Sequence, residues 1–143
     1  MASKLNPYLS FKDNAREAMD FYKSVFGGTL TTNTFKDLGA SQDPSEDDLV
    51  MHSALDVPNG ITIMASDTPA RMEFSGHTGF SMSLSGDDEA ELTGWFNKLA
   101  DGGTVTMPLN KAIWGDTFGM CVDRFGVSWL VNIAGQGGGG ATS

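Results

Sequence analysis

The amino-acid sequence predicts an α+β fold in which two βαβββ modules form a curved mixed sheet around a cleft. The stretch Gly27-Gly28-Thr29-Leu30-Thr31 returns 75 residues later as Gly102-Gly103-Thr104-Val105-Thr106. An ungapped overlay of residues 9–31 on residues 84–106 gives ten identities in 23 positions. An apolar pattern with helical spacing precedes each glycine pair, and strand-like segments flank it. Such self-similarity is typical of two copies of one structural unit.

The first module is predicted to begin with a strand over residues 7–11. Asn14 and Glu17 have the spacing of a capping box, in which the Asn side chain accepts an early helix N–H and the Glu reaches back. Apolar residues then recur at helical spacing until Gly27, which can enter the left-handed cap conformation without a Cβ clash. Three more strands are expected at residues 29–35, 50–57 and 60–66, with a polar loop at residues 36–49.

The second module repeats this order. Residues 80–85 alternate strictly between apolar residues and serine, which indicates a strand. Asp88 and Glu91 cap the following helix, and Gly102-Gly103 ends it. The remaining strands are expected at residues 104–107, 117–123 and 127–133, with a loop at residues 108–116.

These modules fit one domain over residues 1–134, with module 1 at about residues 5–67 and module 2 at about residues 78–133. Residues 135–143 are rich in glycine and are expected to be a flexible tail. One helix covers only one face of a four-stranded sheet. Two such sheets side by side can curl their uncovered faces into a cleft.

Composition excludes several classes of partner. The formal net charge is −9 and the nine basic residues form no cluster, so no basic stripe is available for a nucleic acid. No run of about eighteen apolar residues exists, so we expect no membrane span, and the N-terminus lacks an apolar signal segment. The single cysteine, Cys121, permits no internal disulfide and fits a reducing, cytoplasmic location.

Several motifs carry a resemblance to a known family. They are Pro7-Tyr8-Leu9-Ser10-Phe11, Phe21-Tyr22-Lys23-Ser24-Val25-Phe26-Gly27-Gly28, Met64-Ala65-Ser66-Asp67, Trp114-Gly115-Asp116-Thr117-Phe118-Gly119 and Asp123-Arg124-Phe125-Gly126-Val127-Ser128-Trp129. With them the chain resembles the glyoxalase/bleomycin resistance/extradiol dioxygenase superfamily, also called vicinal oxygen chelate proteins. The resemblance is to its PhnB-like (3-demethylubiquinone-9 3-methyltransferase-like) branch and covers residues 5–133. It implies the doubled βαβββ fold and a homodimer.

The resemblance also implies four positions for a divalent metal ion in the cleft. Many relatives carry a carboxylate four residues after the last turn glycine, and here this position is Leu130. The matching positions are Met64, Asn6 and Ser81. None is an imidazole or a carboxylate, the groups that divalent ions require. A shift of register brings in no better ligands, because the neighbours are Tyr8, Ser10, Ser83, Ser128 and Asn132. We therefore expect that the family metal is lost and that no cofactor is bound.

Four residues remain as candidates for chemistry or binding. His52 points away from the apolar residues of its strand and, with Asp67 or Asp116 nearby, is a weak candidate for a general base; the other histidine, His77, lies in a loop. Cys121 is expected to share a face with the cleft, either as a small buried hydrophobe or as a nucleophile. Trp114 lies in a loop and either lines the cleft or seals a subunit interface.

Three functions remain open. The leading hypothesis is a metal-free, mainly apolar cleft that binds a small molecule through Tyr8, His52, Met64, Trp114 and Leu130. The second is a metal-dependent lyase, isomerase or dioxygenase-like enzyme with unorthodox ligands that include His52. The third is a structural or interaction dimer without cleft chemistry. The sequence does not decide whether the chain catalyses a reaction.

Overall fold

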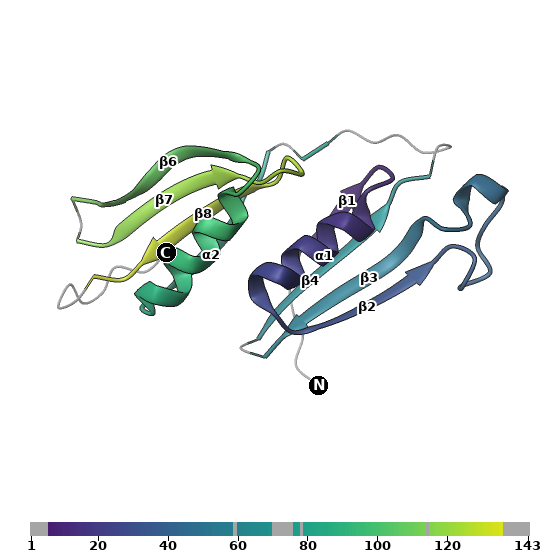
Figure 1. Ribbon diagram of the computed structural model, residues 1–143, viewed down its shortest axis with the longest axis horizontal. Coiled ribbons are helices and arrows are strands. Elements are labelled where there is room, and N and C mark those ends of the chain that lie inside the picture. The colour runs from purple at the N-terminus through teal and green to yellow at the C-terminus, as the bar shows by residue number, and fades with distance from the viewer. Residues whose placement is uncertain (1–5, 59, 70–75, 78, 114, 136–143) are drawn as a thin grey trace. The chain divides into compact units, whose positions relative to one another are not determined.

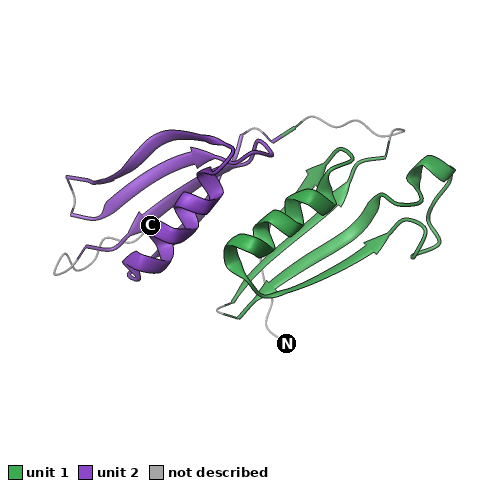
Figure 2. Cartoon of the chain, in the orientation of Figure 1, with its two compact units in different colours: residues 1–76 green, residues 77–143 purple. Residues whose placement is uncertain are grey.

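Each half of the chain forms a four-stranded mixed sheet with one α-helix packed on it (Figure 1). The computed structural model describes residues 6–58, 60–69, 76–77, 79–113 and 115–135. Contacts divide the chain into two units, residues 1–76 and residues 77–143 (Figure 2). The predicted α+β class and its doubled unit are therefore confirmed.

Unit 1 consists of β1 (Tyr8–Phe11), α1 (Ala15–Phe26), β2 (Thr29–Thr34), the 3-10 turn η1 (Pro44–Glu46), β3 (Val50–Val57) and β4 (Ile61–Asp67). Its strands lie in the order β1-β4-β3-β2. Strand β1 runs parallel to β4, and the other neighbours are antiparallel. Helix α1 connects the first two strands and packs against β2, β3 and β4.

Unit 2 consists of β5 (Met82–Gly86), α2 (Glu89–Ala100), β6 (Thr104–Lys111), β7 (Thr117–Val122) and β8 (Ser128–Ile133). Its order β5-β8-β7-β6 is the order of unit 1, again with one parallel pair, β5 and β8. The internal sequence repeat thus corresponds to a repeat of topology.

The second glycine of each repeated pair is required by close backbone packing. A Cβ atom built on Gly28 would lie 2.3 Å from the carbonyl oxygen of Asp56, and one on Gly103 would lie 2.1 Å from that of Val122. Both distances are far below van der Waals contact. The repeat therefore conserves a place where the chain leaves the helix and passes directly against the neighbouring strand.

The predicted capping box of α1 does not form. Asn14 occupies the N-cap position, but its side chain makes no cap hydrogen bond. The Asp67 carboxylate at the end of β4 accepts the Ala15 N–H instead, at 2.9 Å. In α2 the expected cap is present, because the Asp88 side chain accepts the Glu91 N–H at 3.0 Å.

Strand β6 is longer than predicted, since it continues to Lys111 through a segment that we expected to be a loop. The interruption is Pro108, which cannot donate to a ladder. Strand β6 is the edge of its sheet, where a proline is tolerated. The register with β7 shifts once on each side of Met107, so the pairing is irregular there.

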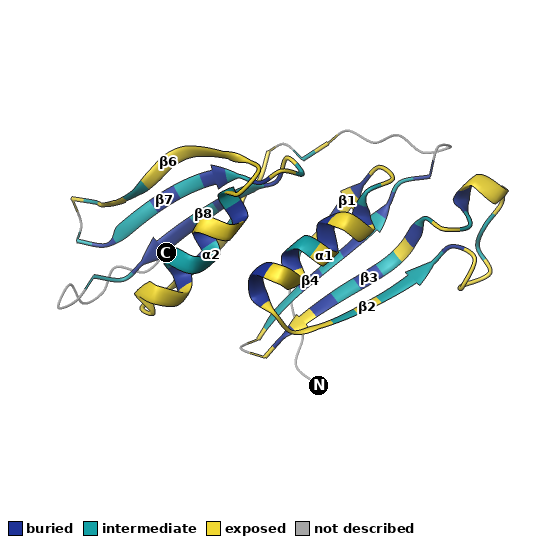
Figure 3. Cartoon of the chain, in the orientation of Figure 1, coloured by how far each residue is buried: buried dark blue, intermediate teal, exposed yellow. Residues whose placement is uncertain are grey.

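The core of each unit lies between its helix and its sheet (Figure 3). Tyr22 of α1 and Trp129 of β8 are the largest fully buried side chains, and burying an apolar side chain stabilises a fold by about 1.5–3 kcal/mol. In the part of the chain that the structure describes, no helix is long and apolar enough to cross a membrane.

Candidate functional site

The side of the first sheet that α1 does not cover is the first candidate surface. Residues of β1, β3 and β4 alternate between positions buried toward α1 and more exposed positions on the other side, as the two-residue period of a strand dictates. We call this other side face 1. Its members are Tyr8, Ser10, Thr29, Thr31, Asn33, His52, Ala54, Asp56, Thr62, Met64 and Ser66.

Three of the predicted ligand-binding residues lie together on face 1. Tyr8 is the register partner of Met64 on the parallel pair β1 and β4. The rings of Tyr8 and His52 lie with their centroids 6.0 Å apart, tilted by 39°. Tyr8 is 49 % exposed, and the other two are partly exposed. A phenol, an imidazole and a thioether therefore form one accessible patch.

His52 does not have Asp67 as a partner for acid–base chemistry. Asp67 is buried on the opposite, helix side of the sheet. Its two carboxylate oxygens accept the N–H groups of Ala15 and Val50, both at 2.9 Å. This carboxylate joins the start of α1 to the start of β3, which is a structural role. The His52 side chain makes a ring contact with Tyr8 instead.

The side of the second sheet that α2 does not cover is the second candidate surface, which we call face 2. One row of side chains crosses it from Ser83 through Leu130 and Met120 to Met107. A second row runs from Ser85 through Asn132 and Phe118 to Asn110. Leu130 thus lies where strand alternation predicts. Trp114, the remaining predicted ligand-binding residue, lies outside the described residues.

The internal repeat relates the two faces position by position. Tyr8 faces Met64 across the parallel pair of unit 1, and Ser83 faces Leu130 across that of unit 2. Likewise His52 of β3 pairs with Asn33, while Phe118 of β7 pairs with Asn110. Face 1 therefore has a phenol and an imidazole where face 2 has a hydroxyl and a phenyl ring. The other two positions of each set are similar, because Met64 and Leu130 are both apolar and Asn33 and Asn110 are both amides.

The residues at the four family metal positions do not fit a divalent ion. Met64 and Leu130 lie on the helix-free sides of their sheets, Asn6 directly precedes Pro7 and β1, and Ser81 directly precedes β5. A thioether, an alkyl group, an amide and a hydroxyl offer neither imidazole nor carboxylate. Within the described ranges, no three His, Cys, Asp or Glu side chains form a group that could hold a metal ion.

A buried pair on face 2, Asp116 and Asn132, was not predicted as a site. The Asn132 amide nitrogen donates to Asp116 Oδ2 at 3.0 Å, and the Gly135 N–H donates to Asp116 Oδ1 at 2.9 Å. Asp116 is 2 % exposed and Asn132 is 8 % exposed. An amide between the apolar residues Val131 and Ile133 is a sequence signal that could have identified the pair.

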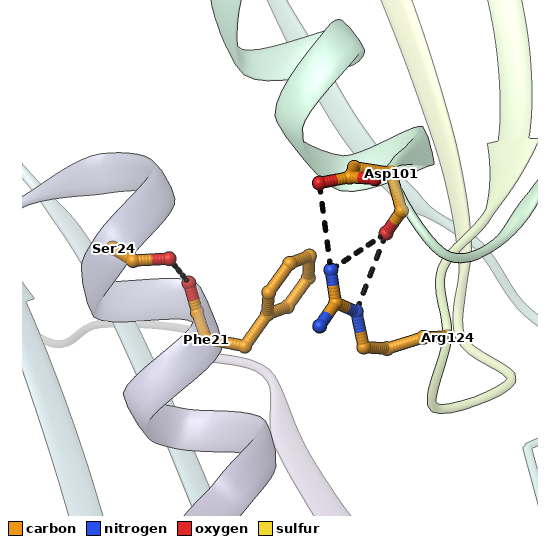
Figure 4. Close-up of polar contacts among 4 residues, drawn as sticks. All are labelled: Phe21, Ser24, Asp101 and Arg124. Carbon is orange, nitrogen blue, oxygen red and sulfur yellow. Dashed lines mark hydrogen bonds and ion pairs between the residues drawn. The ribbon is translucent and has the colours of Figure 1, made fainter.

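The Asp123-Arg124-Phe125-Gly126 motif has a structural explanation. Asp123 Oδ1 accepts the N–H groups of Phe125 and Val127 at 2.8 and 3.1 Å, which closes the turn before β8. The Arg124 guanidinium donates to the Asp101 carbonyl at 2.9 and 3.3 Å and lies 3.7 Å from its carboxylate (Figure 4). Arg124 therefore caps the C-terminal end of α2.

Cys121 faces the core, and the expectation that it shares the helix-free face was wrong. It pairs with Trp129, whose side chain is buried toward α2, and Cys121 is itself 1 % exposed. Burial, with a smaller contribution from the Asp123 carboxylate, raises the pKa of its thiol to about 11. A thiol that stays protonated at neutral pH is a small buried hydrophobe and not a nucleophile.

Comparisons with known proteins agree with this architecture. The family model described as 3-demethylubiquinone-9 3-methyltransferase matches residues 3–132. A solved structure of protein PA1353 from Pseudomonas aeruginosa is 40 % identical, with a TM-score of 0.80 over 94 % of this chain and 100 % of that one. A PhnB protein from Bacillus cereus is 28 % identical, with a TM-score of 0.74 over 92 % of this chain and 100 % of that one.

More distant structures show the fold alone. A glyoxylase/bleomycin resistance protein/dioxygenase domain from Frankia sp. EAN1pec is 13 % identical, with a TM-score of 0.65 over 96 % of this chain and 95 % of that one. The predicted glyoxalase/bleomycin resistance fold is confirmed by this likeness.

Proposed function

The chain belongs to the PhnB-like 3-demethylubiquinone-9 3-methyltransferase family, and we propose that it binds a small organic molecule on the helix-free faces of its sheets without a metal ion. One observation carries the proposal. Tyr8, His52 and Met64 form an accessible patch of aromatic, imidazole and thioether groups on face 1. Sites for small molecules are mainly apolar and aromatic, with a few polar groups that fix orientation.

The polar groups around this patch are suited to orienting a ligand. Ser10 and Ser66 are register partners on β1 and β4, next to the Tyr8–Met64 pair on the same face. Asn33 is the register partner of His52. Hydroxyl, amide and imidazole groups both donate and accept hydrogen bonds, so the surface supports binding of a neutral or weakly polar molecule.

The glycine pairs do not supply a nucleotide-binding loop for methyl transfer. Gly27 ends α1, and Gly102 and Gly103 follow α2. A glycine-rich nucleotide-binding loop leads from a strand into the start of a helix, whereas these glycines follow the ends of helices. The family description therefore identifies relatives of this chain, and ligand binding is the function that its own residues favour.

A binding experiment on two methionine variants tests the proposal. A library of aromatic and aliphatic small molecules is screened against the ¹⁵N-labelled full chain by NMR, with expected shifts at Tyr8, His52 and Met64. Met64→Ala should weaken binding of any hit by roughly tenfold, because the contact of the Met64 thioether with the ligand is lost. Met51→Ala is the matched control, since Met51 is exposed at the start of β3 and, unlike Met64, has no register partner on β2 or β4.

Two outcomes contradict the proposal. If no compound of the library binds to face 1 or face 2, the proposal is wrong. Equal loss of affinity in Met64→Ala and Met51→Ala also speaks against it, because the effect of Met64→Ala would then not come from the patch.

A further inference from the structure

The amide group of Asn132 has a fixed orientation on face 2. Asp116 is a carboxylate with 2 % exposure, and Asn132 Nδ2 donates to its Oδ2 at 3.0 Å. The Gly135 N–H donates to the other oxygen, Asp116 Oδ1, at 2.9 Å. Both oxygens of the Asp116 side chain thus accept a hydrogen bond from an N–H group. The NH₂ group of Asn132 must therefore point to Asp116, and the opposite orientation would set two oxygens against each other.

The carbonyl oxygen of this amide is consequently turned away from Asp116. It accepts no hydrogen bond from the residues that the structure describes. Within the same part of the chain, no fully buried side-chain nitrogen or oxygen lacks a hydrogen-bond partner. Asn132 Oδ1 therefore reaches the surface, although the residue as a whole is 8 % exposed. The result is a preoriented acceptor with limited access.

The neighbours of this oxygen on face 2 are mainly aromatic and aliphatic. Phe118 is the register partner of Asn132 on β7, and Ser85 is its partner on β5. The adjacent row contributes Leu130 and Met120, which pair with each other. All three apolar side chains are partly exposed. An acceptor next to an aromatic ring and two flexible apolar side chains matches a flat molecule that has a hydrogen-bond donor on its edge.

We propose that Asn132 selects aromatic ligands that carry a ring N–H or O–H donor, by accepting that hydrogen bond with Oδ1. Asp116 is the positioning residue, since it keeps the amide from turning. The ring of the ligand lies against Phe118, Met120 and Leu130. This inference rests on the proposed function, because it specifies the class of molecule that face 2 would bind.

Indole and 1-methylindole test the preference, since they share a ring system and differ in the N–H donor. Each is titrated into the ¹⁵N-labelled full chain, and the dissociation constant is obtained from the shifts of face 2 amides and of the Asn132 side-chain amide. Indole should bind about fivefold more tightly, the effect of one hydrogen bond to a neutral acceptor. Equal affinities, or an absence of shifts on face 2 with both compounds, would overturn the inference.

Three variants separate the role of Asn132 in ligand selection from its role in stability. Asn132→Leu removes the acceptor with little change of volume and should make the two affinities equal, whereas Asn97→Leu on the exposed surface of α2 should keep the wild-type ratio. Asp116→Asn allows the Asn132 amide to turn and should lower the ratio toward one. An unchanged ratio in folded Asn132→Leu contradicts the inference. If a variant does not fold, the ratio of the indole and 1-methylindole affinities of the wild-type protein still tests the inference.

The same titrations distinguish this inference from the proposed function. Shifts on face 1 with library compounds, together with equal affinities of the two indoles, would leave small-molecule binding intact and refute donor selection. An absence of hits on both faces would refute both.

Discussion

The carboxylate of Asp123 accepts the indole N–H of Trp129 at 2.9 Å beneath the second sheet. The same side chain closes the turn before β8, so one residue connects the turn with the largest side chain of the core of unit 2. Asp123 is 3 % exposed, and all its hydrogen-bond partners named here are N–H donors. Its side chain thus accepts three hydrogen bonds, two from backbone N–H groups and one from the Trp129 indole.

Asp123→Asn should destabilise the protein by about 1–3 kcal/mol, because an amide NH₂ would face one of three N–H groups and leave a buried donor unsatisfied. Chemical unfolding followed by tryptophan fluorescence measures the loss. Asp20→Asn, on the exposed surface of α1, is the control and should have a negligible effect. Equal stability of the two variants would show that the buried hydrogen bonds contribute little.

Gly28→Ala and Gly103→Ala should each destabilise the fold by about 1–3 kcal/mol, because the added Cβ meets a strand carbonyl and Gly28 has a φ of +92°. Gly94→Ala is a control of opposite sign. Gly94 lies inside α2, its Cβ would meet nothing within 4 Å, and alanine should stabilise the helix by about 0.5–1 kcal/mol. Thermal unfolding of the three variants provides the comparison. A lower melting temperature of Gly94→Ala than of the wild type would contradict the prediction for the helix interior.

The stability of the protein should fall as the pH rises from 9 to 11, owing to Cys121. Its thiol has an ordinary value of 9.0 in the unfolded chain, and burial raises its pKa to about 11 in the folded chain. In this window the unfolded state loses the proton first and is favoured, so up to about 2–3 kcal/mol is lost as pH passes the folded value. The measurement is the difference in unfolding free energy between wild type and Cys121→Ala. A difference independent of pH would be inconsistent with a buried, protonated thiol.

Elemental analysis should find less than one divalent ion per chain after dialysis against manganese, nickel and zinc, because the side chains at the four family positions are poor ligands. The experiment uses protein purified without chelators. One ion per chain that is lost in His52→Ala would favour a metal-dependent lyase, isomerase or dioxygenase-like enzyme instead. Asn97→Ala on the surface of α2 is the control.

A homodimer stays a prediction from the family resemblance. Sedimentation equilibrium should give twice the 15.2 kDa of the chain. A mass of one chain at micromolar concentration would contradict the predicted homodimer. It would also contradict the third hypothesis, that of an interaction dimer without ligand chemistry.

Local patterns predicted most of the fold because they depend on neighbouring residues. Strand alternation placed Met64 and Leu130 on the helix-free sides, and the Asp88 cap formed as its spacing indicated. The errors involve distant partners. Asp67 caps α1 from 52 residues away and displaces the local cap of Asn14. Cys121 was assigned to the wrong face because a shift of one residue in strand register moves every side chain to the other side.

The sequence by itself determined the doubled topology, the helix-free faces and the lack of ionisable groups at the family metal positions, since these follow from a repeat and from periods of 2 and 3.6 residues. Only the tertiary structure decided which side chains meet. Tyr8 and His52 lie on strands that are not neighbours in sequence, and Asp116 reaches Asn132 across a hairpin. Such contacts depend on the strand register and on which donors lie near a buried carboxylate. Neither of these can be predicted from a local sequence pattern.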